Sequence, residues 1–298
     1  MWRLASVGLF SLLSLAACGG NTPGGPANPD DPTPEVPRRF ALDGDPNGLF
    51  WDAANETLYI ADDNNNRILA WTEEEGVTLA AELPPAPPDG PGLGQVVKLA
   101  DGTFVVPRFG FGTSGAVVFV RPDGTSGEVP NLDPKRRRLG LTVAADGTLY
   151  DSFFVSLNGV KNGSVARLDL SGTETEVITG LQKPVGVLAV DDHFIVSDQD
   201  RDLIVRAPMN APTSLEVMAQ LPGPDLLCEG PDGSIFSGGK QGSVRQIWGS
   251  GRFTEIAGDF QEVRGVAYDA ARRRLFIADH DGTEADGVNH ALHILPIE

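Results

Sequence analysis

Cysteine, histidine and basic side chains are all scarce in this chain. Its 298 residues include two cysteines and four histidines, and 23 Lys and Arg stand against 41 Asp and Glu. The resulting net charge of −18 argues against nucleic acid as a partner, because binding to phosphate backbones depends on basic patches. A hydrophobic content of 41% is enough for a folded core, which excludes disorder of the whole chain.

The chain also lacks an apolar run of membrane-spanning length at its start. Arg3 precedes a short apolar run at 7–15, and small residues then lead to Cys18, which is the anatomy of a signal peptide over 1–17. Leu-Ala-Ala-Cys at 15–18 resembles the lipobox of bacterial lipoproteins. The resemblance implies cleavage before Cys18, acylation of that residue and attachment to a membrane. The alternative is an ordinary secretory peptide with an incidental cysteine.

The segment after the cysteine has almost no apolar side chains. Between Gly19 and Pro37 there are six prolines and four glycines, so this stretch cannot repay the entropy of folding. We therefore expect residues 18–37 to be a disordered spacer and residues 38–298 to form the folded domain. Gly19 stands where an Asp would favour retention in the inner membrane, so the predicted location is the bacterial cell envelope, lipid-anchored at the outer membrane.

The other cysteine is predicted to be structural. If Cys18 carries lipid, Cys228 has no partner for an intrachain disulfide. It ends a short apolar run at 224–228, which favours a buried, inert thiol over a nucleophile.

A pattern of four strand-like runs recurs along the chain after residue 37. Its first copy consists of runs at 46–52, 57–62, 67–71 and 77–80. The residues equivalent to Gly48 follow at spacings of 46, 46, 46, 40 and 39, and they are Gly94, Gly140, Gly186, Leu226 and Gly265. A period of about forty residues is typical of modular folds in which each unit packs against its neighbours.

Each unit has a tight polar turn between its first two runs, and three of these turns contain Asp-Gly, which supplies the positive φ that short hairpins need. No stretch after residue 40 sustains a helical apolar period for ten residues. We therefore predict an all-β fold, a six-bladed β-propeller. The last unit is one strand short, and 38–42 is predicted to supply that strand and close the ring. Two β-sandwiches are the alternative, although they would not require six equal modules.

Two phrases of the first unit carry a family resemblance. Asn-Gly-Leu-Phe-Trp at 47–51 and Leu-Tyr-Ile-Ala-Asp at 58–62 resemble a blade of the gluconolactonase, regucalcin and luciferin-regenerating-enzyme family of six-bladed propellers. The blade pattern of NHL-repeat propellers is matched by Asp62, Asn65, Arg67 and Ile68. Over 40–298 the resemblance consists of the regular spacing of the units, and it supports the fold more than the function.

The resemblance implies a divalent cation, Ca²⁺ or another, at the channel mouth. Family members that hydrolyse lactones hold it with a Glu, an Asn and an Asp, and oxygen ligands of this kind polarise a carbonyl or a water. Asn47 matches the Asn and Asp225 matches the Asp. No Glu begins a first strand, and Glu229 falls at the far end of its strand, so the implied metal set is incomplete.

Antiparallel pairing places the start of each first strand beside the end of the second, so polar residues from different units should gather at one mouth. The predicted ligand-binding set is Asn47, Asp62, Arg108, Asp198, Asp225, Arg264 and Asp279. Arg264 lies between the two proposed metal ligands in the order of units and would compete with a dication for Asp225. Two interpretations stay open: a salt bridge from Asp225 to Arg264, or a functional cation site.

The candidates for proton transfer are Asp198 and His280. His280 belongs to the predicted mouth, where an imidazole could act as a general base; the alternative is a solvated loop histidine. His290 and His293 are three apart on the predicted last strand, so they should lie on opposite faces and not share a metal.

The sequence thus favours an envelope-anchored propeller that binds a small molecule or a protein at its acidic mouth. A divalent-cation-dependent lactone or ester hydrolase of the gluconolactonase type is the alternative function. A purely structural role is the third hypothesis.

Overall fold

The protein is built from β-strands arranged as a propeller-like fold. A computed structural model describes residues 36–88, 90–280 and 290–297. Val36–Glu298 forms one compact unit. The predicted signal peptide, Cys18 and the spacer up to residue 35 lie outside the described residues. Among the described residues, no helix is long and apolar enough to cross a membrane.

Four sheets each contain four antiparallel strands that follow one another along the chain. The first sheet is β2 (Pro46–Asp52), β3 (Thr57–Asp62), β4 (Arg67–Thr72) and β5 (Gly76–Glu82). The second is β6 (Val97–Lys98), β7 (Phe104–Arg108), β8 (Ala116–Val120) and β9 (Ser126–Glu128). The third is β10 (Arg137–Val143), β11 (Leu149–Leu157), β12 (Val160–Leu168) and β13 (Glu174–Leu181). The fourth is β14 (Pro184–Val190), β15 (His193–Asp198), β16 (Leu203–Pro208) and β17 (Glu216–Gln220).

The remaining strands form one eight-stranded sheet, where the sequence predicts two separate units. It contains β18 (Pro224–Glu229), β19 (Ile235–Gly239), β20 (Val244–Ile247), β21 (Phe253–Ala257), β22 (Val263–Asp269), β23 (Arg274–Asp279), β24 (Ala291–Pro296) and β1 (Arg38–Ala41). The two halves join through a single residue pair, Gly239 with Val263. They approach this closely because Gly238 has no side chain: a Cβ there would lie 2.6 Å from the Arg264 carbonyl oxygen. We call β18–β21 the fifth group and β22, β23, β24 and β1 the sixth group.

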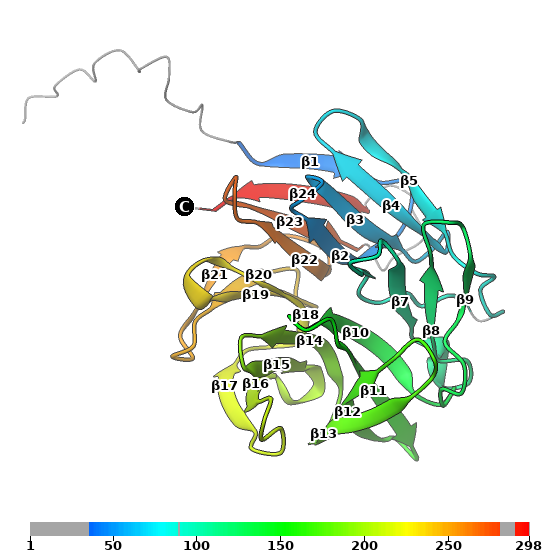
Figure 1. Ribbon diagram of the computed structural model, residues 1–298. Helices are drawn as coiled ribbons and strands as arrows, with labels where there is room; N and C mark the ends of the chain where they lie inside the picture. The colour runs from blue at the N-terminus through cyan, green and yellow to red at the C-terminus, as the bar shows by residue number, and fades with distance from the viewer. Residues whose placement is uncertain (1–35, 89, 281–289, 298) are drawn as a thin grey trace, which may run out of the picture. The chain divides into compact units, whose positions relative to one another are not determined.

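The first strand of the described chain completes the last group, as the sequence predicts. β1 pairs antiparallel with β24, with Arg38 opposite Ile294 and Ala41 opposite Ala291. Figure 1 shows β1 beside β24, so that the two ends of the described fold lie in one sheet.

The inner strands follow one another around a common centre (Figure 1). Strand β10 contacts β6 and β14, β14 contacts β18, β18 contacts β22, and β22 contacts β2, which in turn contacts β6. Glycines make this approach possible. A Cβ atom would lie 2.0 Å from the Leu139 carbonyl oxygen at Gly94, and 2.1 Å from the Asn47 carbonyl oxygen at Gly265.

The core lies between successive groups. One cluster of buried side chains joins the first and sixth groups through Trp71, Phe276 and Leu292, and Phe40 of β1 packs against it. Equivalent clusters lie between the other neighbouring groups and join them. Each cluster is built by the alternating apolar residues of β-branched and aromatic strands.

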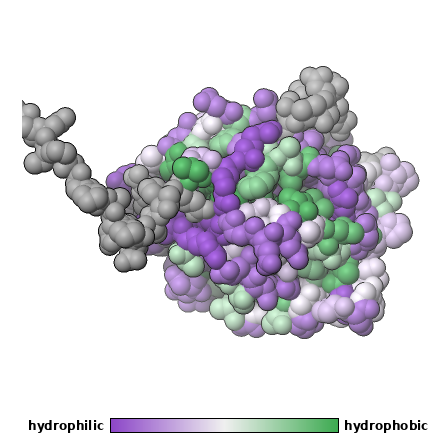
Figure 2. All heavy atoms as spheres, turned by 90° about the horizontal axis from the view of Figure 1, so that it is seen from above, coloured by the Kyte–Doolittle hydropathy of each residue, from purple (hydrophilic) through white to green (hydrophobic). Residues whose placement is uncertain are grey.

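In the described part of the chain, three 3₁₀ turns lie between strands, namely η1 (Gly110–Gly112), η2 (Gln199–Arg201) and η3 (Pro231–Gly233). Figure 2 shows one side of the molecule, where hydrophilic residues cover much of the surface and hydrophobic residues are interspersed among them. Exposed apolar side chains include Leu79, Val217 and Phe253, all on the fourth strands of their groups.

Candidate functional site

The strand register predicted at the mouth is present in the structure. Pro46 lies opposite Asp62, Pro184 opposite Asp198, Pro224 opposite Gly239, and Val263 opposite Asp279. In each of these groups the start of the first, inner strand lies beside the end of the second strand. These strand ends gather at one end of the inner strands. We call this end the mouth.

The acidic residues of the mouth are buried and engaged with nearby backbone. Asp62 accepts hydrogen bonds from the Asp45 amide at 2.9 Å and from Arg67 Nε at 2.7 Å. Asp198 accepts from the Lys183 amide at 2.8 Å, and Asp279 accepts from the Gln261 amide at 2.9 Å. Each carboxylate thus fixes the segment that enters the inner strand of its own group, and a ligand-binding role for these residues stays a prediction.

Arg108 is likewise part of the scaffold. Its side chain is fully buried, and Nη2 donates to Asn66 Oδ1 at 2.8 Å. Nη1 donates to the Pro85 carbonyl oxygen at 3.1 Å and lies 3.3 Å from Glu128. These bonds secure the loop between the first and second sheets.

Asp225 and Arg264 do not form the direct salt bridge that one interpretation expects. The Asp225 carboxylate is buried and accepts a hydrogen bond from Gln199 Nε2 at 2.9 Å. Arg264 instead pairs with Glu262 at 3.2 Å. Burial raises the pKa of Asp225, and the positive charge of Arg264 opposes that rise, so the guanidinium acts on Asp225 from beyond contact distance.

Asn47 lies half-buried at the start of β2, and its carbonyl oxygen faces Gly265 of the sixth group. It occupies the same place in the first group as Asp225 does in the fifth, because each follows the proline that opens its inner strand. Their role as metal ligands stays a prediction.

His280 is close to two groups that the sequence analysis did not combine with it. Its Nδ1 atom contacts Asp45 Oδ1, and His290 Nδ1 lies 3.6 Å from the same oxygen. The two imidazole centroids are 5.4 Å apart. His293, in contrast, points to Asp279, with Nε2 at 3.3 Å from Oδ2.

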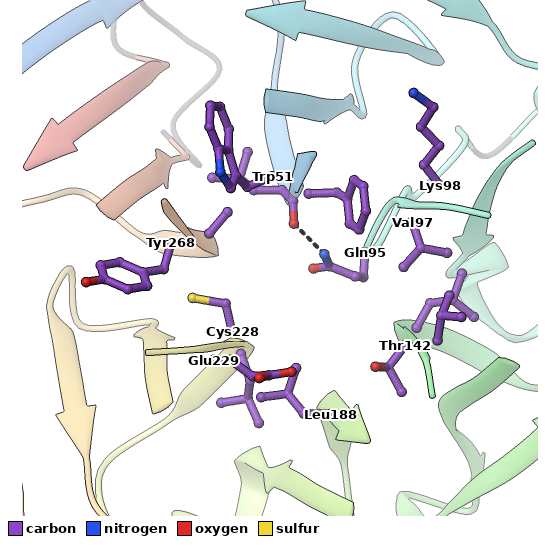
Figure 3. A pocket seen from close by; sticks show the side chains of 15 residues that line it. Trp51, Gln95, Val97, Lys98, Thr142, Leu188, Cys228, Glu229 and Tyr268 are labelled. Atoms are coloured by element: carbon purple, nitrogen blue, oxygen red, sulfur yellow. Dashed lines mark hydrogen bonds between the residues drawn. The ribbon is translucent and has the colours of Figure 1, made fainter. Parts of the chain in front are cut away.

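A cavity of ≈ 350 Å³ lies on the axis, away from the mouth. It is lined by the middle and far ends of the inner strands, namely by Leu49, Phe50, Trp51, Gln95, Val97, Lys98, Leu141, Thr142, Val143, Leu188, Leu227, Cys228, Glu229, Ala267 and Tyr268. Figure 3 shows Gln95, Thr142, Cys228 and Glu229 around this space. All six groups contribute to the wall, so the site exists only when the groups are assembled.

Glu229 supplies the cavity with an acidic group. Its side chain is exposed, and partial desolvation together with the charge of Asp191 raises its pKa. Lys98 does not neutralise it, because Lys98 Nζ donates to Asp52 at 2.9 Å and to Tyr59 Oη at 3.1 Å.

The Cys228 thiol faces the same cavity. Burial and the neighbouring Glu229 charge raise its pKa, so it stays protonated at neutral pH and is a poor nucleophile. This agrees with the inert thiol predicted from the sequence. Cys228 therefore contributes volume and an apolar surface to the wall.

The sequence does not predict the cavity, because the polar residues at the starts of the inner strands indicate a site at the mouth instead. Glu229 falls at the far end of its predicted strand and therefore outside the ligand set predicted from the sequence. A signal was present: Lys98, Thr142 and Glu229 occupy comparable positions late in their inner strands. What the sequence could not show is that the side chains of the six groups leave a space between them on the axis.

No family model matches this chain, and a search of curated proteins found no match. Solved structures do match in fold. A gluconolactonase from Xanthomonas campestris has a TM-score of 0.69 at 20% identity, over 88% of this chain and 90% of that one. Luciferin-regenerating enzyme has a TM-score of 0.68 at 15% identity, over 87% and 95%. The calcium-binding protein regucalcin from Agrobacterium tumefaciens has a TM-score of 0.67 at 14% identity, over 86% and 95%.

These likenesses agree with the family resemblance carried by the first unit, and at such low identity they establish the fold alone. The chain has the architecture of the gluconolactonase, regucalcin and luciferin-regenerating-enzyme propellers.

Proposed function

We propose that this chain is a lipid-anchored binding module of the bacterial envelope, built as a closed six-bladed propeller that holds a small ligand on its axis. Acylated Cys18 is the proposed attachment to the outer membrane, and residues 18–37 the spacer. The pairing of β1 with β24 and the succession of contacts among the inner strands support the closed, six-bladed arrangement.

The axial cavity is the observation that carries the ligand-binding proposal. Its volume of ≈ 350 Å³ falls within the range of small-molecule sites, and its wall combines apolar side chains with few polar groups. Glu229 offers an accessible carboxylate, and Asp191 adds negative charge nearby. We therefore infer a ligand with an apolar body and a cationic amine, since an anion would meet like charge.

A lactonase-type metal site is the second candidate. It is favoured by the equivalent placement of Asn47 and Asp225 and by the gluconolactonase and regucalcin structures of the same fold. We propose that this site is incomplete, because no Glu begins a described inner strand and because the charge of Arg264 acts on Asp225. A dication would have to overcome that repulsion.

Two probes of similar shape and opposite charge test the ligand proposal. Calorimetry with full-length protein in detergent should detect binding of tryptamine, and weaker or no binding of indole-3-propionate, which has a similar body and the opposite charge. Glu229→Gln should weaken tryptamine binding by about tenfold or more, since a charge-assisted hydrogen bond is lost. Glu82→Gln, which changes an exposed acid on β5, should leave it unchanged.

Equal binding of both probes, or binding that Glu229→Gln leaves intact, would overturn the ligand proposal. The second candidate is tested in the same preparations with sugar lactones. Turnover that needs added Ca²⁺ and disappears in Asn47→Ala and Asp225→Ala would establish the hydrolase in its place.

A further inference from the structure

Three potential metal ligands meet at the mouth, apart from the axial cavity. A carboxylate oxygen of Asp45 and one ring nitrogen each of His280 and His290 lie within 4.8 Å of one another. All three side chains are half-buried, and their relative exposures are 17%, 16% and 19%. We propose that these residues bind a divalent transition-metal ion of the Zn²⁺ class.

The local structure explains why the two histidines are neighbours. Strands β23 and β24 pair with Asp279 opposite Ala291, so the next residue outward on each strand brings His280 opposite His290. The His280 amide donates to the Glu262 carbonyl oxygen at 2.8 Å, and the Leu42 amide donates to the His290 carbonyl oxygen at 3.0 Å. Both imidazoles therefore stand on a backbone that is fixed by the sheet.

Asp45 is held in place from a different part of the chain. It lies in the short link from β1 to β2, where its amide donates to Asp62 Oδ1 at 2.9 Å. Its carbonyl oxygen accepts from the Asp63 amide at 2.8 Å. Two hydrogen bonds thus hold the backbone of Asp45 without using its carboxylate oxygens, and the carboxylate faces the histidines.

The separations fit a metal after small side-chain adjustments. Ligand atoms in a tetrahedral site with bonds of about 2.0–2.1 Å are about 3.3 Å apart. The distance from His290 Nδ1 to Asp45 Oδ1 is 3.6 Å, and His280 Nδ1 already contacts that oxygen. An ion would separate the latter pair and bridge all three groups.

The ligand chemistry selects the kind of ion. Imidazole nitrogens favour Zn²⁺, Co²⁺ and Ni²⁺, whereas Ca²⁺ and Mg²⁺ require oxygen ligands. This set contains two nitrogens and one carboxylate, unlike the Asn47 and Asp225 oxygens considered above. Three protein ligands also leave a coordination position open to water or to another molecule.

The electrostatic surroundings favour a cation. Asp63 interacts with both Asp45 and His280, and its own carboxylate accepts from the Leu93 amide at 2.6 Å. Arg264, whose charge also acts on Asp63, pairs with Glu262 at 3.2 Å, and Arg67 pairs with Asp62 at 2.7 Å. Both of these cations therefore have an acidic partner, and Asp63 adds negative charge beside Asp45 and His280.

Cobalt spectroscopy gives a direct test on the full-length protein in detergent, stripped of metal by a chelator. One Co²⁺ per chain should produce visible ligand-field absorption, and Zn²⁺ should displace it. Asp45→Asn, His280→Gln and His290→Gln should each weaken Co²⁺ binding by about tenfold or more, because each removes one of three ligands. Zn²⁺ should also raise the thermal unfolding midpoint of the unmodified chain.

The matched control is His193→Gln. His193 also sits beside an aspartate, Asp192, but at the start of β15 and without a third ligand. It should leave Co²⁺ binding unchanged. Unfolding curves without metal establish that each variant is folded.

Any of three results would overturn the site. If Co²⁺ and Zn²⁺ do not bind, Asp45 and His280 form only a hydrogen-bonded pair. If Ca²⁺ binds more tightly than Zn²⁺, or if the ligand variants bind like the unmodified chain, the metal is held elsewhere. The outcome is separable from the axial-ligand proposal, since Glu229→Gln should retain metal binding and His280→Gln should retain tryptamine binding.

Discussion

At the scale of single residues, the buried acids of this fold stabilise its loops by accepting hydrogen bonds from backbone amides. Asp62, Asp198 and Asp279 each end a second strand and each accept an amide hydrogen bond from the residues just before the neighbouring inner strand. Such bonds satisfy backbone donors that the ladders leave unpaired. The acidic character of the mouth is therefore first a property of how the chain enters its inner strands.

Glu73 gives a pH-dependent prediction at this scale. Hydrogen bonds from Arg38 and then Arg274 hold the pKa of Glu73 at about 2, below its ordinary value of 4.5. A lowered folded-state pKa stabilises the fold above the unfolded value and loses this effect as the pH falls through the folded one. Glu73→Gln should therefore reduce stability at pH 7, and the difference should vanish as the pH falls from about 4.5 towards 2.

The expected cost at pH 7 is about 1 kcal/mol, because 45% of the Glu73 side chain is exposed and solvent screens the pairs. Urea unfolding across the pH range measures it. Glu74→Gln changes an exposed acid of the same turn and is the control. A Glu73→Gln penalty that persists unchanged at pH 2 would show that the ion pairs are not its source.

At the scale of elements, neighbouring groups are joined by backbone contacts that serine and glycine make possible. Ser152 Oγ accepts from the Gly140 amide at 3.0 Å and donates to the Val185 carbonyl oxygen at 2.8 Å. Ser197 makes the same bridge between Gly186, at 2.6 Å, and Asp225, at 2.8 Å. These bridges connect inner strands that are not paired in a ladder.

Gly265→Ala should disrupt the junction of the first and sixth groups. The new Cβ would lie 2.1 Å from the Asn47 carbonyl oxygen and 3.0 Å from the Leu49 amide nitrogen, so backbone has to move. We expect a loss of about 3 kcal/mol in the free energy of unfolding. Gly249→Ala is the control, because its Cβ would meet no atom nearer than 4.0 Å. Equal effects of the two substitutions in urea unfolding would refute this account of the junction.

Much of this element structure could be predicted from the sequence. The recurring glycines and turns indicate the strand groups and the strand register at the mouth, because close packing and positive φ have few other solutions. The joining of the fifth and sixth groups could not be foreseen, since it depends on one close approach at Gly238. Nor could the meeting of Asp45 with His290, which requires the β23–β24 register and the position of β1 together.

At the scale of the whole molecule, a single compact unit follows an N-terminal segment for which we propose a lipid anchor. The fold presents the axial cavity and the mouth at different levels of the same axis. The net charge of the whole chain is −18, and this excess of acidic residues should help to keep the protein away from anionic membrane surfaces.

Substitution of each cysteine in turn distinguishes the proposed lipid anchor from the folded domain. Cys18→Ser should move the protein from the membrane fraction to the soluble fraction and abolish incorporation of labelled fatty acid, because two or more acyl chains are needed for durable attachment. Cys228→Ser should retain both properties. Membrane association that survives in Cys18→Ser would exclude acylation at this residue as the anchor.

The position of β1 also decides how mechanical load would enter the fold. A pull on the N-terminal segment reaches Arg38 first, and from there it is carried by the four residue pairs of β1 with β24 and by the bond from Arg38 to Glu73 at 2.7 Å. The strand that completes the sixth group would therefore be the first to yield under tension. Its detachment would remove Phe40 from the cluster that joins the first and last groups, so traction at one end of the chain could loosen the assembly.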